Sequence, residues 1–334
     1  EGESLDKFYP TNVLVTGPDI IFFWVARMIM TGYEFMDERP FKDVYFTSIL
    51  RDETGRKLSK SLGNSPDPFE LFDEFGTDAV RFGIMLMAPQ GLDVLFSKNR
   101  LEIGRNFMNK LWNACRFIQM NIPEEWDNEI QFEKAELDLP EQWILSRLSI
   151  TIQDYNQQLD RFHFNEAVKV LYEFIWSDFC DWYVEIAKTR FYGEDDSKAN
   201  IARTVALKCI RTVLALLHPY APFITEELWN HFKQEGAFDL IISPWPKSDS
   251  LQNETAEKDM SLLQDVITSI RSVRSRMNVP PSKFFDLVVR CNGKQESFLN
   301  DHVALLRSLA RIEDVSMGET IEKPGQSATA VAGG

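Results

Sequence analysis

Residues 51–64 read Arg-Asp-Glu-Thr-Gly-Arg-Lys-Leu-Ser-Lys-Ser-Leu-Gly-Asn and follow an apolar run, residues 43–50, that is typical of a β-strand. Lys57 and Lys60 stand three residues apart with hydroxyl side chains beside them. Two ammonium groups and two hydroxyls can donate to the oxygens of a polyphosphate, each lysine acting as a mobile point charge. Gly55 gives this loop the backbone freedom to close over a nucleotide and reopen. A solvated basic loop is the better interpretation of such a pattern in isolation, so the flanking residues decide.

Composition indicates an ordinary globular protein. The chain has 334 residues, 44% hydrophobic and 26% charged, which predicts two to three domains that each bury a core. No apolar run approaches the roughly 20 residues of a membrane span. The acidic start at residues 1–3 does not resemble a signal peptide. We expect a cytoplasmic protein without a membrane partner.

The cysteines and the net charge exclude other classes. Four scattered cysteines without a C-x-x-C pair argue against a zinc knuckle or disulfide framework and fit a reducing cytoplasm. The net charge of −15 argues against a nonspecific nucleic-acid binder. RNA binding would therefore need local basic surfaces, and residues 98–116 and 271–276 are the two candidates.

The first part of the chain alternates strand and helix. Residues 11–16 predict a strand, a glycine turn at 17–19 leads into a helix to about Met30, and residues 43–50 predict a second strand, parallel to the first. The free N–H groups at such a helix start commonly bind a nucleotide or carboxylate. Asp19 as a simple helix cap is an equally good interpretation. Phe23 and Trp24 are predicted to be core residues.

Helices dominate the rest. Asp67-Pro68 predicts a helix start, with Phe69, Phe72 and Phe75 as its buried stripe, and a second helix over 77–87. From about residue 98, apolar residues at helical spacing predict a bundle. Its helices are expected at 100–120, 141–160, 165–191, 200–217, 221–232 and 253–278, with an acidic loop at 123–139. A strand (284–290), a helix (294–310) and a strand (314–317) form a small α/β appendage, and the tail from Lys323 is expected to be disordered or truncated.

Residues 57–61 resemble the second signature loop of class I aminoacyl-tRNA synthetases, K-M-S-K-S, with Leu58 in place of methionine. Other stretches narrow the resemblance to the branched-aliphatic subgroup and, within it, to the valyl-tRNA synthetases. These are residues 9–20 (YPTNVLVTGPDI), 23–28 (FWVARM), 67–68, 78–82 (DAVRF), 104–107 (GRNF) and 177–183 (SDFCDWY). The resemblance covers nearly the whole chain.

This resemblance implies activation of valine by ATP, bound with Mg²⁺, and transfer to tRNA-Val, with no protein-bound metal. It implies that Lys57 and Lys60 are catalytic, stabilising charge on the β- and γ-phosphates as pyrophosphate leaves. Such donors typically contribute on the order of 10²–10³ in rate. It further implies the following ATP-binding and amino-acid-pocket residues: Ser59 and Ser61 at phosphate, Gly17 and Asp19 at the ribose and amino-acid side, the backbone at Ile49 and Leu50 beside adenine, and Ile20 in the valine pocket.

The same resemblance implies that the bundle reads the tRNA anticodon. Phe117 stands where family members stack on anticodon bases, and Arg100 lies near the position of a family arginine contact. Arg271 and Arg274 adjoin the apolar seam of the last long helix and are further candidates. Core packing is an alternative for Phe117, and a solvated edge or pairing with bundle carboxylates is an alternative for the two arginines.

The expected fold class is mostly α: a partial α/β Rossmann half with the lysine loop (1–97), a helical anticodon-binding bundle (98–280) and a small α/β segment with a flexible tail (281–334). None of the four histidines forms the H-x-G-H motif of class I active sites, so we expect a monomeric piece of a larger enzyme, inactive alone. Alternatives are a non-catalytic tRNA anticodon-binding fragment, or a fragment of an isoleucyl- or leucyl-tRNA synthetase.

Overall fold

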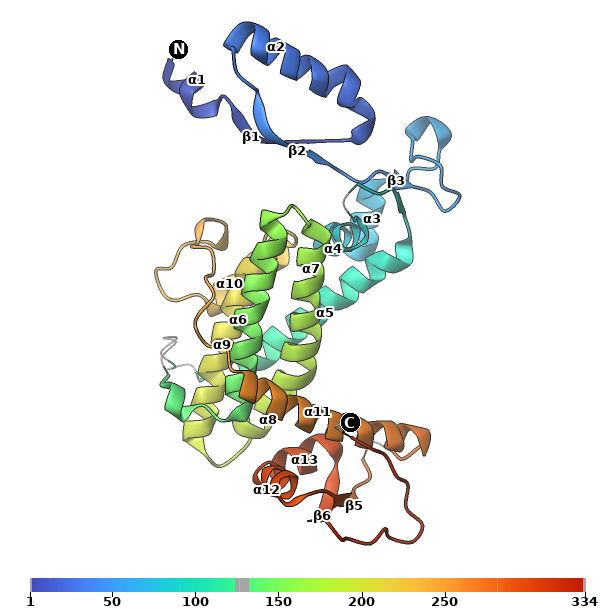
Figure 1. The fold of residues 1–334 in the computed structure, drawn as a ribbon, viewed down its shortest axis with the longest axis vertical. Coiled ribbons are helices and arrows are strands. Elements are labelled where there is room, and N and C mark those ends of the chain that lie inside the picture. Colours follow the sequence, from blue (N-terminus) through green and yellow to red (C-terminus); the bar gives the residue numbers. More distant parts are fainter. Residues whose placement is uncertain (1, 90, 124–125, 127–131, 281, 333–334) are drawn as a thin grey trace.

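The computed structural model describes residues 2–89, 91–123, 126, 132–280 and 282–332. Helices make up most of this part of the chain, and its strands form three two-stranded parallel sheets (Figure 1). The prediction of a mostly helical chain with small α/β parts is confirmed. An N-terminal unit lies at one end of the long axis, a helical bundle in the middle and a C-terminal unit at the other end (Figure 1).

The N-terminal unit is a strand–helix–strand arrangement. It comprises α1 (Gly2–Phe8), β1 (Thr11–Thr16), a 3-10 turn (Pro18–Ile20), a π-helical turn (Ile21–Val25), α2 (Ala26–Met36) and β2 (Phe41–Phe46). β1 and β2 pair in parallel, with Val13 opposite Asp43 and Val15 opposite Tyr45, as predicted. The helical segment continues to Met36, past the predicted end at Met30, and stops where Asp37 adopts a left-handed conformation (φ 54°).

The prediction that Phe23 and Trp24 are core residues was wrong. Their side chains are 65% and 57% exposed, and several apolar neighbours on the same helical segment are also exposed. Helical spacing identifies an apolar face, but whether protein covers that face depends on elements far away in the sequence. In this chain none of the described elements covers it.

The predicted strand over 43–50 is in fact two strands. β2 ends at Phe46, and β3 (Leu50–Arg51) pairs instead with β4 (Val94–Leu95). Thr47 N–H still donates to the Thr16 carbonyl, whereas the Ile49 carbonyl accepts from Val94 N–H. The apolar run therefore changes partner in its middle, which carries the chain from the N-terminal sheet toward the bundle.

Two short helices follow the lysine loop. α3 (Pro68–Phe75) begins as predicted, because the Asp67 carboxylate accepts from Phe69 N–H at 2.9 Å. Its buried face differs from the prediction, since Leu71 and Phe75 are buried while Phe69 is 74% exposed. α4 (Thr77–Met87) then packs against α5 (Lys98–Met120). Gly104 permits this contact, because a Cβ atom there would lie 2.3 Å from the Ala79 carbonyl oxygen.

The bundle forms the main core. Its helices are α5, α6 (Leu139–Asp160), α7 (Phe164–Glu173), α8 (Val184–Phe191), α9 (Asp196–Leu217) and α10 (Pro222–Phe232), with a π-helical segment (Phe174–Tyr183) joining α7 to α8. Residues 164–191 are thus one continuous helical run, as predicted. Within this run Phe174, Phe179 and Tyr183 are fully buried, whereas Trp176 and Trp182 are partly exposed. Tyr45 of β2 packs on Phe162 and Phe164 and ties the N-terminal unit to the bundle.

α11 (Glu254–Arg276) crosses the lower end of the bundle and leads to the C-terminal unit (Figure 1). There β5 (Phe285–Arg290) pairs in parallel with β6 (Ile312–Gly318), and α12 (Gly293–Asp301) and α13 (Val303–Ala310) lie between them in sequence. The single helix predicted over 294–310 is interrupted at His302, whose φ of −112° departs from helical geometry. Within the described residues, no helix combines the length and apolar character needed to cross a membrane.

Candidate active site

The lysine loop projects from β3 as a tight hairpin (Figure 1). Asp52 N–H donates to the Arg56 carbonyl at 2.8 Å. Gly55 lies in the turn with a φ of 83°, a left-handed backbone conformation that residues with a side chain rarely adopt. Leu58 N–H then donates to the Leu50 carbonyl at 3.2 Å. Residues 57–58 therefore return alongside β3 through a single bridge, and residues 60–63 are exposed.

Lys57 reaches across to the turn after β1. Its ammonium lies 2.7 Å from the Asp19 carboxylate, and both side chains are about half exposed. The hydrogen bond from Lys57 is the main cause that lowers the pKa of Asp19. The structure thus joins the glycine turn 17–19 and the loop 57–61, two segments that sequence reasoning proposed for ATP separately. Sequence reasoning did not predict the contact between these two segments.

The other loop residues differ from Lys57 in their contacts. Lys60 begins a short 3-10 turn (Lys60–Leu62), is exposed, and forms no ion pair with any described acidic residue. The hydroxyls of Ser59 and Ser61 lie 2.7 Å apart. The loop therefore presents one paired lysine, one solvated lysine and two adjacent hydroxyls, a set of donors suited to phosphate oxygens.

The remaining candidates for ATP and amino-acid binding lie on the same two segments. A Cβ atom at Gly17 would lie 2.7 Å from the Asp19 carboxylate oxygen, so glycine allows the acid to fold back over the turn. Ile20 follows directly and is 38% exposed. Ile49 and Leu50 are half-buried at the base of the loop, and their carbonyls already accept from Val94 and Leu58.

The two RNA candidates on α5 are not brought together. Arg100 is exposed in the first turn of the helix, and Phe117 is half-buried near its end. Seventeen residues of α-helix correspond to about 25 Å. The Phe117 ring packs with Phe191 and Tyr192, and the Lys188 ammonium lies 5.3 Å from its centre. These contacts agree with core packing of Phe117, the alternative given above to base stacking.

Arg271 and Arg274 have partners that neither sequence interpretation proposed. The Arg271 guanidinium donates twice to the Leu309 carbonyl, at 3.0 and 3.2 Å, and lies over the Trp182 ring. Arg274 donates to the carbonyls of Ala310 and Pro280. Both arginines thus bind carbonyls at the end of α13, where a helix leaves its last acceptors unsatisfied. They attach the C-terminal unit to α11.

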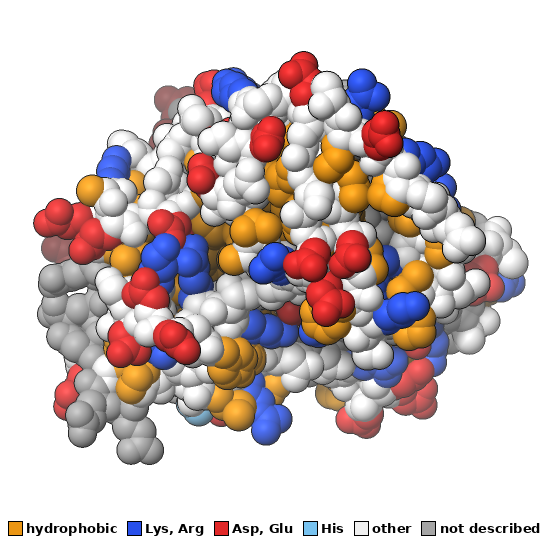
Figure 2. All heavy atoms as spheres, turned by 90° about the horizontal axis from the view of Figure 1, so that it is seen from below, with side chains coloured by type: hydrophobic (Ala, Val, Ile, Leu, Met, Phe, Trp, Pro, Cys, Tyr) orange, Lys and Arg blue, Asp and Glu red, His pale blue; other side chains and the backbone are white. Residues whose placement is uncertain are grey.

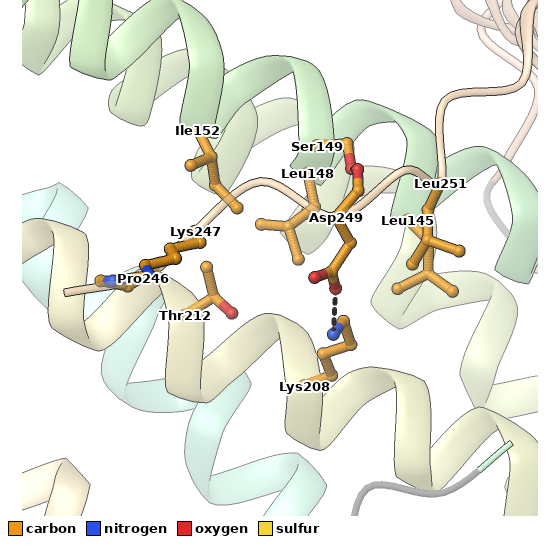
Figure 3. A pocket seen from close by; sticks show the side chains of 10 residues that line it. All are labelled: Leu145, Leu148, Ser149, Ile152, Lys208, Thr212, Pro246, Lys247, Asp249 and Leu251. Carbon is orange, nitrogen blue, oxygen red and sulfur yellow. Dashed lines mark hydrogen bonds and ion pairs between the residues drawn. The ribbon is translucent and has the colours of Figure 1, made fainter. Parts of the chain in front are cut away.

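Two cavities of the bundle are lined by none of the residues of the lysine loop. They are neighbours, each of about 160 Å³. One is lined by α6, α9 and residues 246–251, and the other by α6, Lys134, Leu137 and residues 250–253. Figure 3 shows one of them, where Lys208 and Asp249 form an ion pair at 2.5 Å that spans the opening. Among the described residues, no three His, Cys, Asp or Glu side chains gather as metal ligands.

Two protein families match the chain. "tRNA synthetases class I (I, L, M and V)" matches residues 1–97, and "Anticodon-binding domain of tRNA ligase" matches residues 141–289. Similar curated proteins are valine--tRNA ligases of Fusobacterium nucleatum (44% identity), Thermotoga maritima (42%) and Bacillus subtilis (41%), each aligned over 99% of this chain. The chain spans only 37–38% of the length of these relatives.

Solved structures with a similar fold are also synthetases. A leucyl-tRNA synthetase complex from Agrobacterium radiobacter, with tRNA and LeuAMS, has a TM-score of 0.56 at 22% identity, over 75% of this chain and 30% of that one. Methionyl-tRNA synthetase of Mycobacterium tuberculosis with methionyl-adenylate also has a TM-score of 0.56, at 20% identity, over 69% of this chain and 46% of that one. At this identity the likeness concerns the fold alone.

Proposed function

The chain belongs to the class I valyl-tRNA synthetases, and from this premise we propose that it supplies the ATP-contacting lysine loop and the anticodon-binding bundle of a valine--tRNA ligase. The observation that carries the proposal is the ion pair between Lys57 and Asp19, because it joins the glycine turn and the lysine loop at one place. The proposed substrates and partners are valine, ATP with Mg²⁺, and tRNA-Val.

In the proposed reaction the valine carboxylate attacks the α-phosphorus of ATP, and the bond to the β-phosphate breaks as pyrophosphate leaves. The chain need supply no nucleophile, so its contribution is charge and positioning. Lys60 is exposed and can therefore reach phosphate oxygens directly. Lys57 exchanges the Asp19 carboxylate for phosphate, an exchange favoured because both partners are half exposed. Mg²⁺ bound to ATP would supply further charge.

The other proposed contacts follow from the two joined segments. The hydroxyls of Ser59 and Ser61 would donate to phosphate or shape the loop. Gly17 and Asp19 would face the ribose and amino-acid side of the adenylate, with Ile20 beside valine. The backbone at Ile49 and Leu50 would border adenine. Support for this arrangement comes from their placement on the strand ends and turns next to the Lys57–Asp19 pair.

For the bundle we propose tRNA anticodon binding, with Phe117 and Arg100 as contacts. The anticodon-binding family match over 141–289 supports this role. Tyr192, 72% exposed beside Phe117, offers a second aromatic surface on which a base can stack. Figure 2 shows basic and acidic side chains interspersed over one face of the molecule, which favours local contacts over a broad basic footprint. For Arg271 and Arg274, RNA contact is proposed in addition to their carbonyl contacts.

We further propose the boundaries 1–97, 98–280 and 281–334 for the catalytic part, the bundle and the C-terminal segment. The exposed apolar face of the N-terminal unit supports the view that the chain alone binds tRNA but does not activate valine. More than half of the length of the relatives lies outside the matched span, and we propose that the corresponding polypeptide covers this face.

A chimera tests the catalytic proposal. In it, this chain replaces the matching segment of the Fusobacterium nucleatum valine--tRNA ligase, to which it is 44% identical. We expect valine-dependent exchange of pyrophosphate with ATP, and none with isoleucine or leucine at equal concentration. A folded chimera that activates no amino acid would refute the proposal, and one that prefers isoleucine or leucine would assign the chain to that specificity.

Binding of the isolated chain to tRNA transcripts tests the bundle. We expect it to bind tRNA-Val more tightly than tRNA-Ile, and to lose that preference when the tRNA-Val anticodon is changed. Binding that is equal for both transcripts and strongly salt-dependent would instead indicate phosphate contacts alone. The measurement is a titration at two salt concentrations.

A further inference from the structure

Asp52 and Asn64 stand at the two ends of the lysine loop and meet through their side chains. We propose that they are positioning residues, which together hold the backbone of residues 57–59 in the form that presents Lys57, Ser59 and Lys60. The effect of this positioning on catalysis rests on the proposed function, whereas its effect on the shape of the loop does not.

The Asp52 carboxylate collects the donors of the turn. It accepts from Thr54 N–H at 3.0 Å, Thr54 Oγ1 at 2.7 Å, Arg56 N–H at 2.9 Å, Arg56 Nε at 2.8 Å and Asn64 Nδ2 at 2.8 Å. These donors, with Asn64 the largest cause, hold the pKa of Asp52 well below its usual range. Its side chain is 14% exposed, much less than those of its partners in the turn. The Asp52 carboxylate thus connects the turn, Arg56 and Asn64 through hydrogen bonds.

The Asn64 amide forms hydrogen bonds with the backbone of residues 57–59. Its Nδ2 atom also donates to the Lys57 carbonyl at 3.2 Å, and its Oδ1 atom accepts from Ser59 N–H at 2.9 Å. An ionised carboxylate can only accept hydrogen bonds, so Asp52 requires the NH₂ group of Asn64 to face it. The Oδ1 atom is thereby directed to Ser59. Asp52 thus sets the orientation of the amide, and the amide sets the path of the loop.

The segment 57–59 is held from two sides. On one side β3 binds it, through the bridge between Arg51 and Lys57 and the hydrogen bond from Leu58 N–H to the Leu50 carbonyl. On the other side, the Asn64 amide takes the place of a second strand, pairing with one carbonyl and one N–H. The 3-10 turn that carries Lys60 begins directly after Ser59. Without Asn64 this segment would keep only one of its two edges.

The hydrogen bonds of Asp52 and Asn64 do not lie over a buried apolar core. Residues 53–57 and 60–63 are exposed, so the hydrogen bonds order the loop without burying apolar surface behind it. Removing them should change the loop while leaving the fold intact. That separation makes the proposal testable in the chain as it is.

The first test is limited proteolysis of Asn64→Ala and Asp52→Asn, with Glu53→Gln as the matched control. Glu53 is the exposed acid next to Asp52 in the same turn. We expect tryptic cleavage after Lys57 and Lys60 to be about tenfold faster in both loop variants, since each loses hydrogen bonds that close the loop. Glu53→Gln should match the unsubstituted chain. The melting temperatures of all four proteins should agree, and unchanged cleavage in both loop variants would overturn the proposal.

The second test measures kinetics in the chimera described above. We expect Asn64→Ala to lower kcat of ATP–pyrophosphate exchange by up to about 10²-fold, because misplaced charge loses transition-state stabilisation. The KM for valine should stay unchanged, a split that a general loss of stability would not give. An active chimera with a normal kcat after Asn64→Ala would contradict the positioning role. An inactive unsubstituted chimera would refute the proposed function instead, and the proteolysis would still decide the loop.

Discussion

The two lysines of the loop are chemically alike but differ in their surroundings. Lys57 already has an anionic partner in Asp19, whereas Lys60 is solvated. Because exposed ion pairs contribute little to stability, a polyphosphate with several negative charges can displace Asp19 from Lys57. In the proposed function, the pair would keep Lys57 close to the turn 17–19 until ATP binds, and Lys60 would add its charge from solvent.

We expect Lys57→Ala and Lys60→Ala each to lower kcat of ATP–pyrophosphate exchange by about 10²–10³-fold in the chimera, the usual effect of one lost charge donor. Lys42→Ala, on the exposed side of β2, is the control and should leave the rate unchanged. Initial rates at saturating valine and ATP measure the effect. If either loop variant kept more than half of the control rate, that lysine would have no catalytic role.

Local elements could be predicted from the sequence, because their causes are local. The start of α3 at Asp67-Pro68 and the parallel pair β1–β2 with a helix between them follow from capping and periodicity. The break between β2 and β3 could not be predicted, since it depends on pairing with β4, more than forty residues away. The contact of Lys57 with Asp19 and the carbonyl partners of Arg271 are long-range for the same reason.

Glu141 is a buried acid at the start of α6, and we expect it to make the stability of the chain depend on pH. Burial raises its pKa to about 7, and its Oε2 atom lacks a hydrogen-bond partner among the described residues. The folded chain therefore keeps a proton that the unfolded chain releases above its ordinary pKa of 4.5. The contribution of Glu141 therefore lowers stability as the pH rises from about 4.5 to 7, by about 3 kcal/mol in total.

Glu141→Gln removes this titration, so we expect the variant to be more stable than the unsubstituted chain at pH 8 and similar to it at pH 4.5. Urea unfolding at both pH values measures the difference. Glu194→Gln, an exposed acid before α9, is the control and should change neither value. A difference that is the same at both pH values would show that Glu141 does not titrate in this range.

Arg271, at the junction between α11 and α13, is expected to hold the C-terminal unit against α11. Its guanidinium binds the Leu309 carbonyl twice, and a charge-assisted hydrogen bond contributes roughly 1.5–3 kcal/mol. We expect Arg271→Ala to speed hydrogen exchange in α13 and β6, whereas Arg276→Ala, an exposed arginine on the same helix, should not. Weaker tRNA binding without faster exchange would point to RNA contact as the main role of Arg271.

The whole molecule has one end that is unlike the rest. The bundle buries most of its large aromatic side chains, such as Phe107, Phe174 and Tyr183, but the N-terminal unit exposes a run of large apolar side chains on its helical segment. Those more than half exposed are Phe22, Phe23, Trp24, Met30, Tyr33 and Phe35. Apolar patches of this kind mark interaction surfaces, and we propose that other protein covers this one. In a protein as long as the relatives, the remaining polypeptide is the cover we propose.

This face leads to opposite expectations for the isolated chain and for the chimera. In the isolated chain, Phe22→Ser combined with Phe35→Ser should reduce binding of an apolar dye and self-association, because the exposed apolar area decreases. In the chimera the same pair should destabilise the protein, because those side chains would then be buried and each loses about 1.5–3 kcal/mol of burial free energy. Dye fluorescence and sedimentation measure the first effect, and thermal unfolding the second. Phe69→Ser, at an exposed phenylalanine of α3, is the control. If the pair left the stability of the chimera unchanged, the face would remain exposed in the assembled enzyme, and a second copy of the chain would become the better candidate for its cover.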